Sequence, residues 1–124
     1  MSQSTEIAAE ELLAGAYADF NARRIDAVLV RLHPEVEWAN GMEGGHEHGR
    51  DAVRAYWTRQ WAILDPHVDP LAIERDAGGR WVVEVHQVVH DVQGKLLLDT
   101  VVHHAYRIAD GLIERMDILE QPNT

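Results

Sequence analysis

The chain has 124 residues, of which 46% are hydrophobic, and this composition suits one globular domain with one core. Its formal charge of −10 comes from 21 acidic against 11 basic residues, and such a surface repels phosphate backbones and anionic lipid, so we expect neither nucleic acid nor a membrane as a partner. The lack of cysteine excludes disulfides, thiol nucleophiles and thiolate metal sites. The polar N-terminal stretch does not resemble a secretory signal, and no apolar run approaches the ~20 residues that span a bilayer, so we expect a cytoplasmic protein.

Three stretches carry apolar residues at helical spacing and therefore predict helices. The first covers residues 5–22, and a shorter one follows over residues 25–32. Pro34 ends the second helix, because the residue before a proline disfavours the α region. The third helix runs from residue 50 to residue 64 and stops at the Asp65-Pro66 pair.

Strands account for most of the remaining chain. We expect a short strand at residues 35–39, a glycine-rich loop at residues 40–49 and a weaker strand at residues 67–76. Residues 81–120 hold three apolar runs separated by two Gly-containing turns, which predicts three long antiparallel strands in a meander. The order α-α-β-α-β-β-β-β indicates the α+β class: a curved antiparallel or mixed sheet wrapped as a cone around three N-terminal helices, with a hollow inside.

Three local stretches, together with this order of elements, resemble the nuclear transport factor 2-like superfamily. They are LLAGAYADFNARRIDAVLVRLHPEVEW, GRDAVRAYW and DGLIERMDIL. The superfamily includes SnoaL-like polyketide cyclases, ketosteroid isomerase and limonene epoxide hydrolase, and the resemblance covers residues 1–124 as a single domain. It implies a pocket between sheet and helices, with a carboxylate from the last strand at its deep end. Asp117 falls where that carboxylate would lie.

The patterns of two superfamily enzymes are incomplete here. Limonene epoxide hydrolase holds its water with a Tyr-x-Asn pair, and Trp38-Ala39-Asn40 occupies that place, so Asn40 matches but Trp38 lacks the hydroxyl. The hydrolase also needs an Arg-x-Asp pair, whose nearest counterpart is Glu84-Val85-His86, without an arginine. The tyrosine and protonated acid of ketosteroid isomerase cannot both be placed.

The register of the first hairpin of the meander follows from its turn. A two-residue turn at Gln93-Gly94 pairs Val92 with Lys95 and places Val83 opposite His104. The more apolar face is then the inner one. It carries Val83, Val85, Gln87, Val89, Leu98, Thr100, Val102, His104 and Tyr106. The polar side chains of Gln87 and Thr100 need a partner there, which could be a neighbour, a water or a ligand. An odd-residue loop would instead turn Glu84 and His86 inward as an acid/base pair.

The second hairpin decides where Asp117 points. A two-residue turn at Asp110-Gly111 pairs Ala109 with Leu112 and places His104 directly opposite Asp117 as an acid/base dyad. A three-residue turn would place Asp117 opposite His103 on the polar outer face, with no chemistry. The residues leave both registers open, and the resemblance, which implies an inward carboxylate, favours the first.

The aromatic residues and the glycine-rich loop each have two interpretations. Tyr17, Trp57 and Trp61 could line a pocket for a flat apolar ligand or pack as ordinary core, whereas we expect Tyr56 and Arg59 at the surface. The loop segment His46-Glu47-His48 could cover the pocket mouth or bind a metal. Spacing fixes no third ligand, so we expect neither metal nor cofactor.

Two functional hypotheses follow. The first is a cofactor-independent enzyme of the SnoaL-like type that isomerises, cyclises, dehydrates or hydrolyses a small apolar molecule. Asp117 would be its acid or base with His104 as partner, and Asn40 would orient substrate or water. The substrate-binding residues would be Tyr17, Trp38, Asn40, Trp57, Trp61, Gln87, Thr100 and Tyr106. The second is a non-catalytic ligand-binding or dimerisation module of the same fold.

An apolar patch on the outer sheet face is the basis for expecting a homodimer. We place Trp81, Leu97 and Val101 on that face. Superfamily members often dimerise through this surface, so the resemblance implies an isologous interface there.

Overall fold

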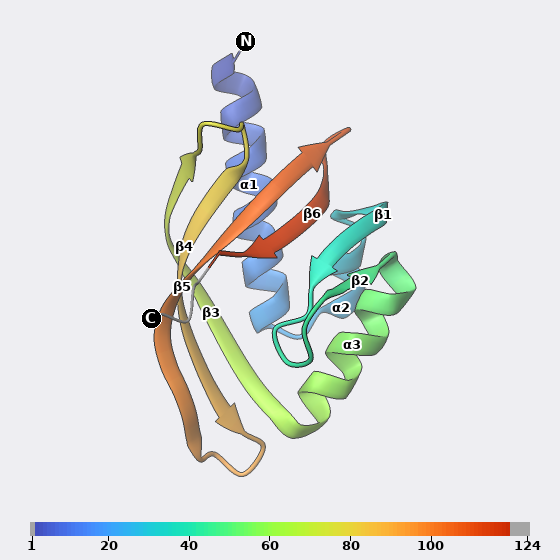
Figure 1. Ribbon diagram of the computed structural model, residues 1–124, viewed down its shortest axis with the longest axis vertical. Coiled ribbons are helices and arrows are strands. Elements are labelled where there is room, and N and C mark those ends of the chain that lie inside the picture. Colours follow the sequence, from blue (N-terminus) through green and yellow to red (C-terminus); the bar gives the residue numbers. More distant parts are fainter. Residues whose placement is uncertain (1, 120–124) are drawn as a thin grey trace.

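The computed structural model describes residues 2–119, and Figure 1 shows how their elements are arranged. In chain order the elements are α1 (Ser2–Asn21), α2 (Ile25–Leu29), β1 (Leu32–Ala39), β2 (His46–His48), α3 (Arg50–Ile63), β3 (Leu64–Arg75), β4 (Trp81–Asp91), β5 (Leu96–Ala109) and β6 (Leu112–Ile118). The predicted α+β class and the three N-terminal helices are confirmed. The predicted end of the meander at residue 120 lies outside the described residues.

The strands form one six-stranded sheet in the order β2-β1-β6-β5-β4-β3. β1 and β6 pair in parallel, and the other neighbours pair antiparallel, so the sheet is mixed and open. In Figure 1 the long strands β3, β4 and β5 bend together, α1 lies against them, and α3 runs beside β1 and β2. The sheet thus wraps around the helices and leaves an inner face for a core and a cavity.

The loop predicted at residues 40–49 contains the short strand β2. It pairs with the end of β1 through Trp38 opposite Glu47 and Ala39 opposite His46. The strand β1 is also longer than predicted and begins at Leu32, whose carbonyl oxygen accepts a hydrogen bond of 2.9 Å from Nε of Arg50. The second helix ends at Leu29 and is shorter than predicted, because the strand β1 begins three residues later.

Two ion pairs to the buried carboxylate of Asp19 tie α1 to the segment around α2. The carboxylate of Asp19 accepts hydrogen bonds from Nη2 of Arg24 at 2.9 Å and Nε of Arg31 at 3.1 Å. Burial opposes its charge, but these two guanidinium groups outweigh burial and lower the pKa of Asp19. Gly15, one turn earlier, packs directly under the Arg31 guanidinium, where a Cβ would collide with it.

The predicted register between β4 and β5 is confirmed, but its turn is not. Val83 lies opposite His104 and Gln87 opposite Thr100, as the inner face requires. The turn, however, holds three residues, because the amide of Asp91 donates to the carbonyl oxygen of Lys95 at 2.9 Å. A register shift next to Val89 takes up the extra residue.

The predicted pairing of His104 with Asp117 is wrong. The two-residue turn at Asp110-Gly111 forms as expected, with φ of 57° and 75° at these two residues. A register shift then follows, so Asp117 lies opposite Ala105 and His104 opposite Ile118. One extra residue turns every following side chain to the other face, and the carboxylate leaves the inner side.

Candidate functional site

A cavity of about 420 Å³ lies between α1, α3 and the inner face of the sheet. Its wall is mostly apolar, with polar groups from Tyr17, Tyr56, Gln60, Gln87, His104 and Tyr106. Among the described residues that line it, none is Asp, Glu, Lys or Arg. A cavity of this size and character suits a small, mainly apolar molecule.

A hydrogen-bonded chain of three side chains occupies one part of the cavity wall. The Tyr106 hydroxyl donates to the Tyr17 hydroxyl at 2.7 Å, and the Tyr17 hydroxyl lies 2.7 Å from Nδ1 of His104. His104 and Tyr106 are two residues apart on β5 and so share the inner face, while Tyr17 reaches them from α1. All three are buried, and the rings of Tyr17 and His104 stack with centroids 5.9 Å apart.

Both tyrosines of this chain stay neutral across the physiological range. Burial raises the pKa of Tyr106, and burial together with the neighbouring Tyr106 raises the pKa of Tyr17 well above its usual value. If Tyr17 donates to Nδ1, a neutral imidazole at His104 carries its proton on Nε2. Reversal of the two hydrogen bonds would place the proton on Nδ1 and leave Nε2 as a base.

Aromatic rings form the wall next to this chain. Trp38 and Trp57 line the cavity and meet edge to face, with centroids 5.2 Å apart. Trp61 stacks on Trp57 at 5.9 Å and lies under the guanidinium of Arg23, so it supports the wall from behind and is not a lining residue. The predicted binding positions of Trp38 and Trp57 therefore face the cavity, whereas that of Trp61 does not.

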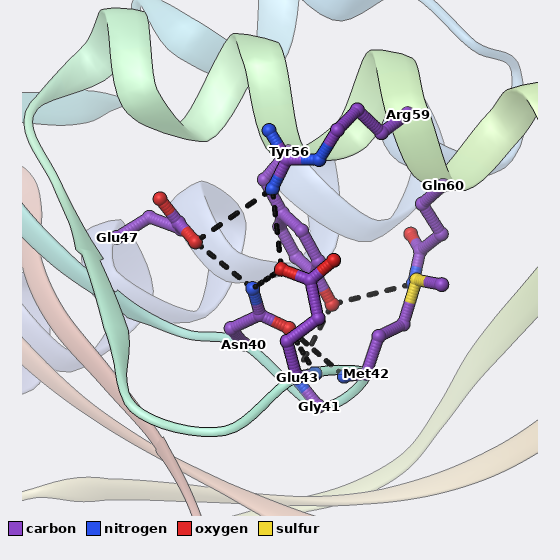
Figure 2. Close-up of polar contacts among 8 residues, drawn as sticks. All are labelled: Asn40, Gly41, Met42, Glu43, Glu47, Tyr56, Arg59 and Gln60. Atoms are coloured by element: carbon purple, nitrogen blue, oxygen red, sulfur yellow. Dashed lines mark hydrogen bonds and ion pairs between the residues drawn. The ribbon is translucent and has the colours of Figure 1, made fainter.

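Asn40 organises its own loop, as Figure 2 shows. Its Nδ2 donates to carboxylate oxygens of Glu43 at 3.1 Å and Glu47 at 2.9 Å. Its Oδ1 accepts from the amides of Met42 at 2.9 Å and Glu43 at 2.7 Å. Both donor hydrogens and both lone pairs of the amide are therefore engaged, which leaves Asn40 no group to orient a substrate.

Tyr56 was expected at the surface and is instead buried beside the cavity. Its hydroxyl accepts from the amide of Gly41 at 3.2 Å and from Nε2 of Gln60 at 3.4 Å (Figure 2). Burial raises its pKa, so it stays a phenol. It thereby holds the loop residues Gly41 and Met42 in the cavity wall, while Arg59 stays exposed as predicted.

Asp117 lies on the outer side of the sheet, away from the cavity. Its carboxylate accepts from Nε of Arg115 at 2.8 Å and lies 2.8 Å from Nε2 of His46. Partial burial opposes its charge, but the bonds from Arg115 and His46 outweigh it and lower its pKa. Its neighbours in sequence, Met116 and Ile118, line the cavity instead.

The segment His46–His48 forms the strand β2. His46 contacts Asp117, and His48 lies 3.0 Å from the carboxylate of Glu35. Across residues 2–119, no group of three or more His, Asp or Glu side chains is arranged to hold a metal ion. The same residues include no helix long and apolar enough to cross a membrane.

The outer face of β4 and β5 carries charged side chains between apolar ones, and two expectations about it are corrected. His86 pairs with Asp99 at 2.7 Å, so the alternative that turned Glu84 and His86 inward is not adopted. Trp81 belongs to the core and lies under the Arg75 guanidinium at 4.4 Å, because it shares the inner face with Val83. Leu97 lines the cavity. Of the predicted outer patch only Val101 remains, at 42% exposure.

Gln87 and Thr100 lie opposite each other on the sheet, but only one of the two lines the cavity. Gln87 lines the cavity, and Thr100 is not among the lining residues. Six of the predicted site residues line the cavity, and their roles there stay predictions: Tyr17, Trp38, Trp57, Gln87, His104 and Tyr106. It missed Tyr56 and the bond between Tyr17 and His104. The helical spacing of Tyr56 with Val53 and Trp57 was the available indication.

An open α+β cone with an apolar cavity between its helices and its inner sheet face is the architecture of the nuclear transport factor 2-like fold. The sequence matches the SnoaL-like domain over residues 13–116, and the chain belongs to this family. A comparison with curated protein sequences finds no match.

Solved structures share the fold at low sequence identity. An NTF2-like protein of unknown function from Burkholderia pseudomallei is 24% identical, with a TM-score of 0.77 over 88% of this chain and 87% of its own. A candidate polyketide cyclase from Pseudomonas putida is 19% identical, with a TM-score of 0.77 over 90% of each chain. TerC, co-crystallised with polyporic acid, is 24% identical, with a TM-score of 0.77 over 90% of this chain and 89% of its own.

Proposed function

We propose that the protein binds a small, flat, mostly apolar molecule in its cavity and moves a proton to or from it through His104. The observation that carries this proposal is the bond of 2.7 Å between Tyr17 and Nδ1 of His104 inside an apolar cavity of about 420 Å³. Histidine is the side chain whose ordinary titration lies nearest neutral pH, which suits it to acid/base work.

The two tyrosines would set the state of the imidazole. When Tyr17 donates to Nδ1, Nε2–H can donate a hydrogen bond to a substrate oxygen on which negative charge develops. When the bonds reverse, Nε2 can accept a proton from an acidic C–H or O–H of the substrate. Because Tyr106 donates to Tyr17, the reversal needs only rotation of two hydroxyl groups and a change of tautomer. Isomerisation, cyclisation, dehydration and hydrolysis all use such a step.

A non-catalytic binding function is the second candidate, favoured by one observation. No carboxylate is among the described residues that line the cavity, and Asp117 is engaged outside it with Arg115 and His46. A carboxylate beside the ring commonly supports the imidazolium that forms during acid/base catalysis. The same cavity could then hold a ligand without changing it.

Exchange of ketone α-protons for deuterium separates the two candidates. We would follow 2-tetralone in D₂O by NMR with wild type, His104→Asn, Tyr17→Phe and Asp117→Asn, and measure its binding through quenching of Trp38 and Trp57 fluorescence. Acid/base function predicts that His104→Asn slows catalysed exchange about 100-fold or more and that Tyr17→Phe has a smaller effect.

Asp117→Asn is the matched control, because it removes a carboxylate on the outer side and should leave exchange unchanged. Binding without any catalysed exchange in the wild type would favour the non-catalytic candidate. Loss of exchange in Asp117→Asn but not in His104→Asn would refute the assignment to His104.

A further inference from the structure

Gln87 occupies a second polar position on the cavity wall. It lies on the inner face of β4, between Val68 on β3 and Thr100 on β5. The backbone at this place is fixed, because the side chain of Asn21 donates to the carbonyl oxygen of Val68 at 2.8 Å and accepts from its amide at 2.9 Å. These two hydrogen bonds join the end of α1 to β3, the strand next to Gln87.

The side-chain amide of Gln87 makes no hydrogen bond to the protein within residues 2–119. Among the amides and hydroxyls of the described lining residues, only the Gln87 amide has no protein partner within residues 2–119. Tyr17 and Tyr106 bond to each other, and Gln60 bonds to Tyr56. Gln87 is partly buried, so its amide can bond to water or to a ligand that enters the cavity.

Gln87 and His104 are far apart on the same surface. Gln87 lies opposite Thr100, and His104 is four residues further along β5, which corresponds to about 13 Å along the strand. The lining between and around them offers no charged side chain among the described residues. A charged ligand group at the Gln87 end would therefore have no counter-ion among the described lining residues.

We infer that Gln87 binds a polar group at the far end of the ligand from His104, so that the cavity selects neutral, elongated molecules with a hydrogen-bonding group at each end. The ligand's carbonyl or hydroxyl group meets His104, its flat apolar body lies against Trp38 and Trp57, and its second polar group reaches Gln87. This inference rests on the proposed function for the location of the ligand and adds the chemical class that the cavity accepts.

Three matched probes test it: flavone, 4′-hydroxyflavone and flavone-4′-carboxylate. They share one body and one carbonyl group and differ only in the distal group, which is absent, neutral or anionic. Their dissociation constants would be measured by calorimetry with wild type, Gln87→Leu and Thr100→Val. Thr100 is the control, because it is the direct cross-strand neighbour of Gln87 but does not line the cavity.

The wild type should bind 4′-hydroxyflavone about tenfold more tightly than flavone, as one additional neutral hydrogen bond allows, and should bind the carboxylate more weakly than flavone. Gln87→Leu should remove the preference for the hydroxyl, and Thr100→Val should retain it. A preference that survives Gln87→Leu, the absence of any preference in the wild type, or tightest binding of the carboxylate would overturn the inference.

Failure of the proposed function and failure of the Gln87 inference give different results in this experiment. If none of the three probes binds, or if they bind outside the cavity without quenching Trp38 and Trp57, then the cavity does not hold flat apolar molecules and both proposals fail. If flavone binds in the cavity but Gln87→Leu changes nothing, only the role of Gln87 is refuted.

Discussion

Replacement of Tyr17 by phenylalanine would show whether the buried hydrogen-bonded chain behaves as one unit. The Tyr17 hydroxyl is its centre, 2.7 Å from Nδ1 of His104 and 2.7 Å from the Tyr106 hydroxyl. Its removal leaves two buried groups without their partner. At ~1–1.5 kcal/mol for each lost bond, we expect Tyr17→Phe to lower the free energy of unfolding by about 2–3 kcal/mol. Tyr106→Phe removes one bond at the end of the chain and should cost about 1 kcal/mol.

Urea denaturation followed by circular dichroism would measure these costs, since an unchanged slope with a lower midpoint reports a change in stability alone. The double variant should cost little more than Tyr17→Phe, because the bond made by Tyr106 is already lost. Equal costs for the two single variants, or a double variant that equals their sum, would refute the view that both bonds run through Tyr17.

Four other substitutions test separate parts of the structure. Asn40→Ala should speed amide hydrogen exchange across residues 41–45, measured by mass spectrometry, because all of the loop's bonds to that amide are lost. Gly15→Ala should not lower the melting temperature, because the atoms that its Cβ would meet are the end of the flexible Arg31 side chain, which can move away, and alanine favours helices. The pKa of Asp117 is lowered in the folded state, so its contribution to stability is present above its ordinary range and is lost as the pH falls below it. Wild type and Asp117→Asn should therefore differ in urea midpoint near pH 7 and converge in acid. Val101→Glu should convert a homodimer formed through the outer face into monomers in sedimentation velocity, and a monomeric wild type would refute that interface.

The inner face of β4 and β5 could be predicted because its hydrophobic pattern, and not its turn, determines the register. Val83 and Val85 are fully buried, and a slip of one residue would have brought Glu84 and His86 into the core. The cost of burying those charges is far larger than the cost of a bulge. A wrong turn length therefore still gave the right face for His104.

The face of β6 on which Asp117 lies could not be predicted, because it depends on a bulge at Glu114 that arises from contacts distant in sequence. β6 lies between β1 and β5, and its pairing with both is irregular between Ile113 and Arg115. Glu114 has no opposite residue in either ladder. The parallel neighbour β1 comes from residues far away in the sequence, so no local pattern around Glu114 shows that an extra residue must be accommodated there.

The position of Asp117 on the outer face changes the chemistry that the site can support. With Asp117 outside, the proposed proton acceptor is the His104 imidazole beside Tyr17, and none of the described lining residues is a carboxylate. A base of this kind matches protons that are already fairly acidic, such as those of phenols, enols and activated ketones, because proton transfer is efficient when the two acidities are close. Ring opening or bond cleavage that needs a strong general acid would lack its donor. On the proposed function, the substrate should therefore be a molecule whose own conjugation stabilises the anion, which agrees with a flat aromatic cavity wall built from Trp38 and Trp57.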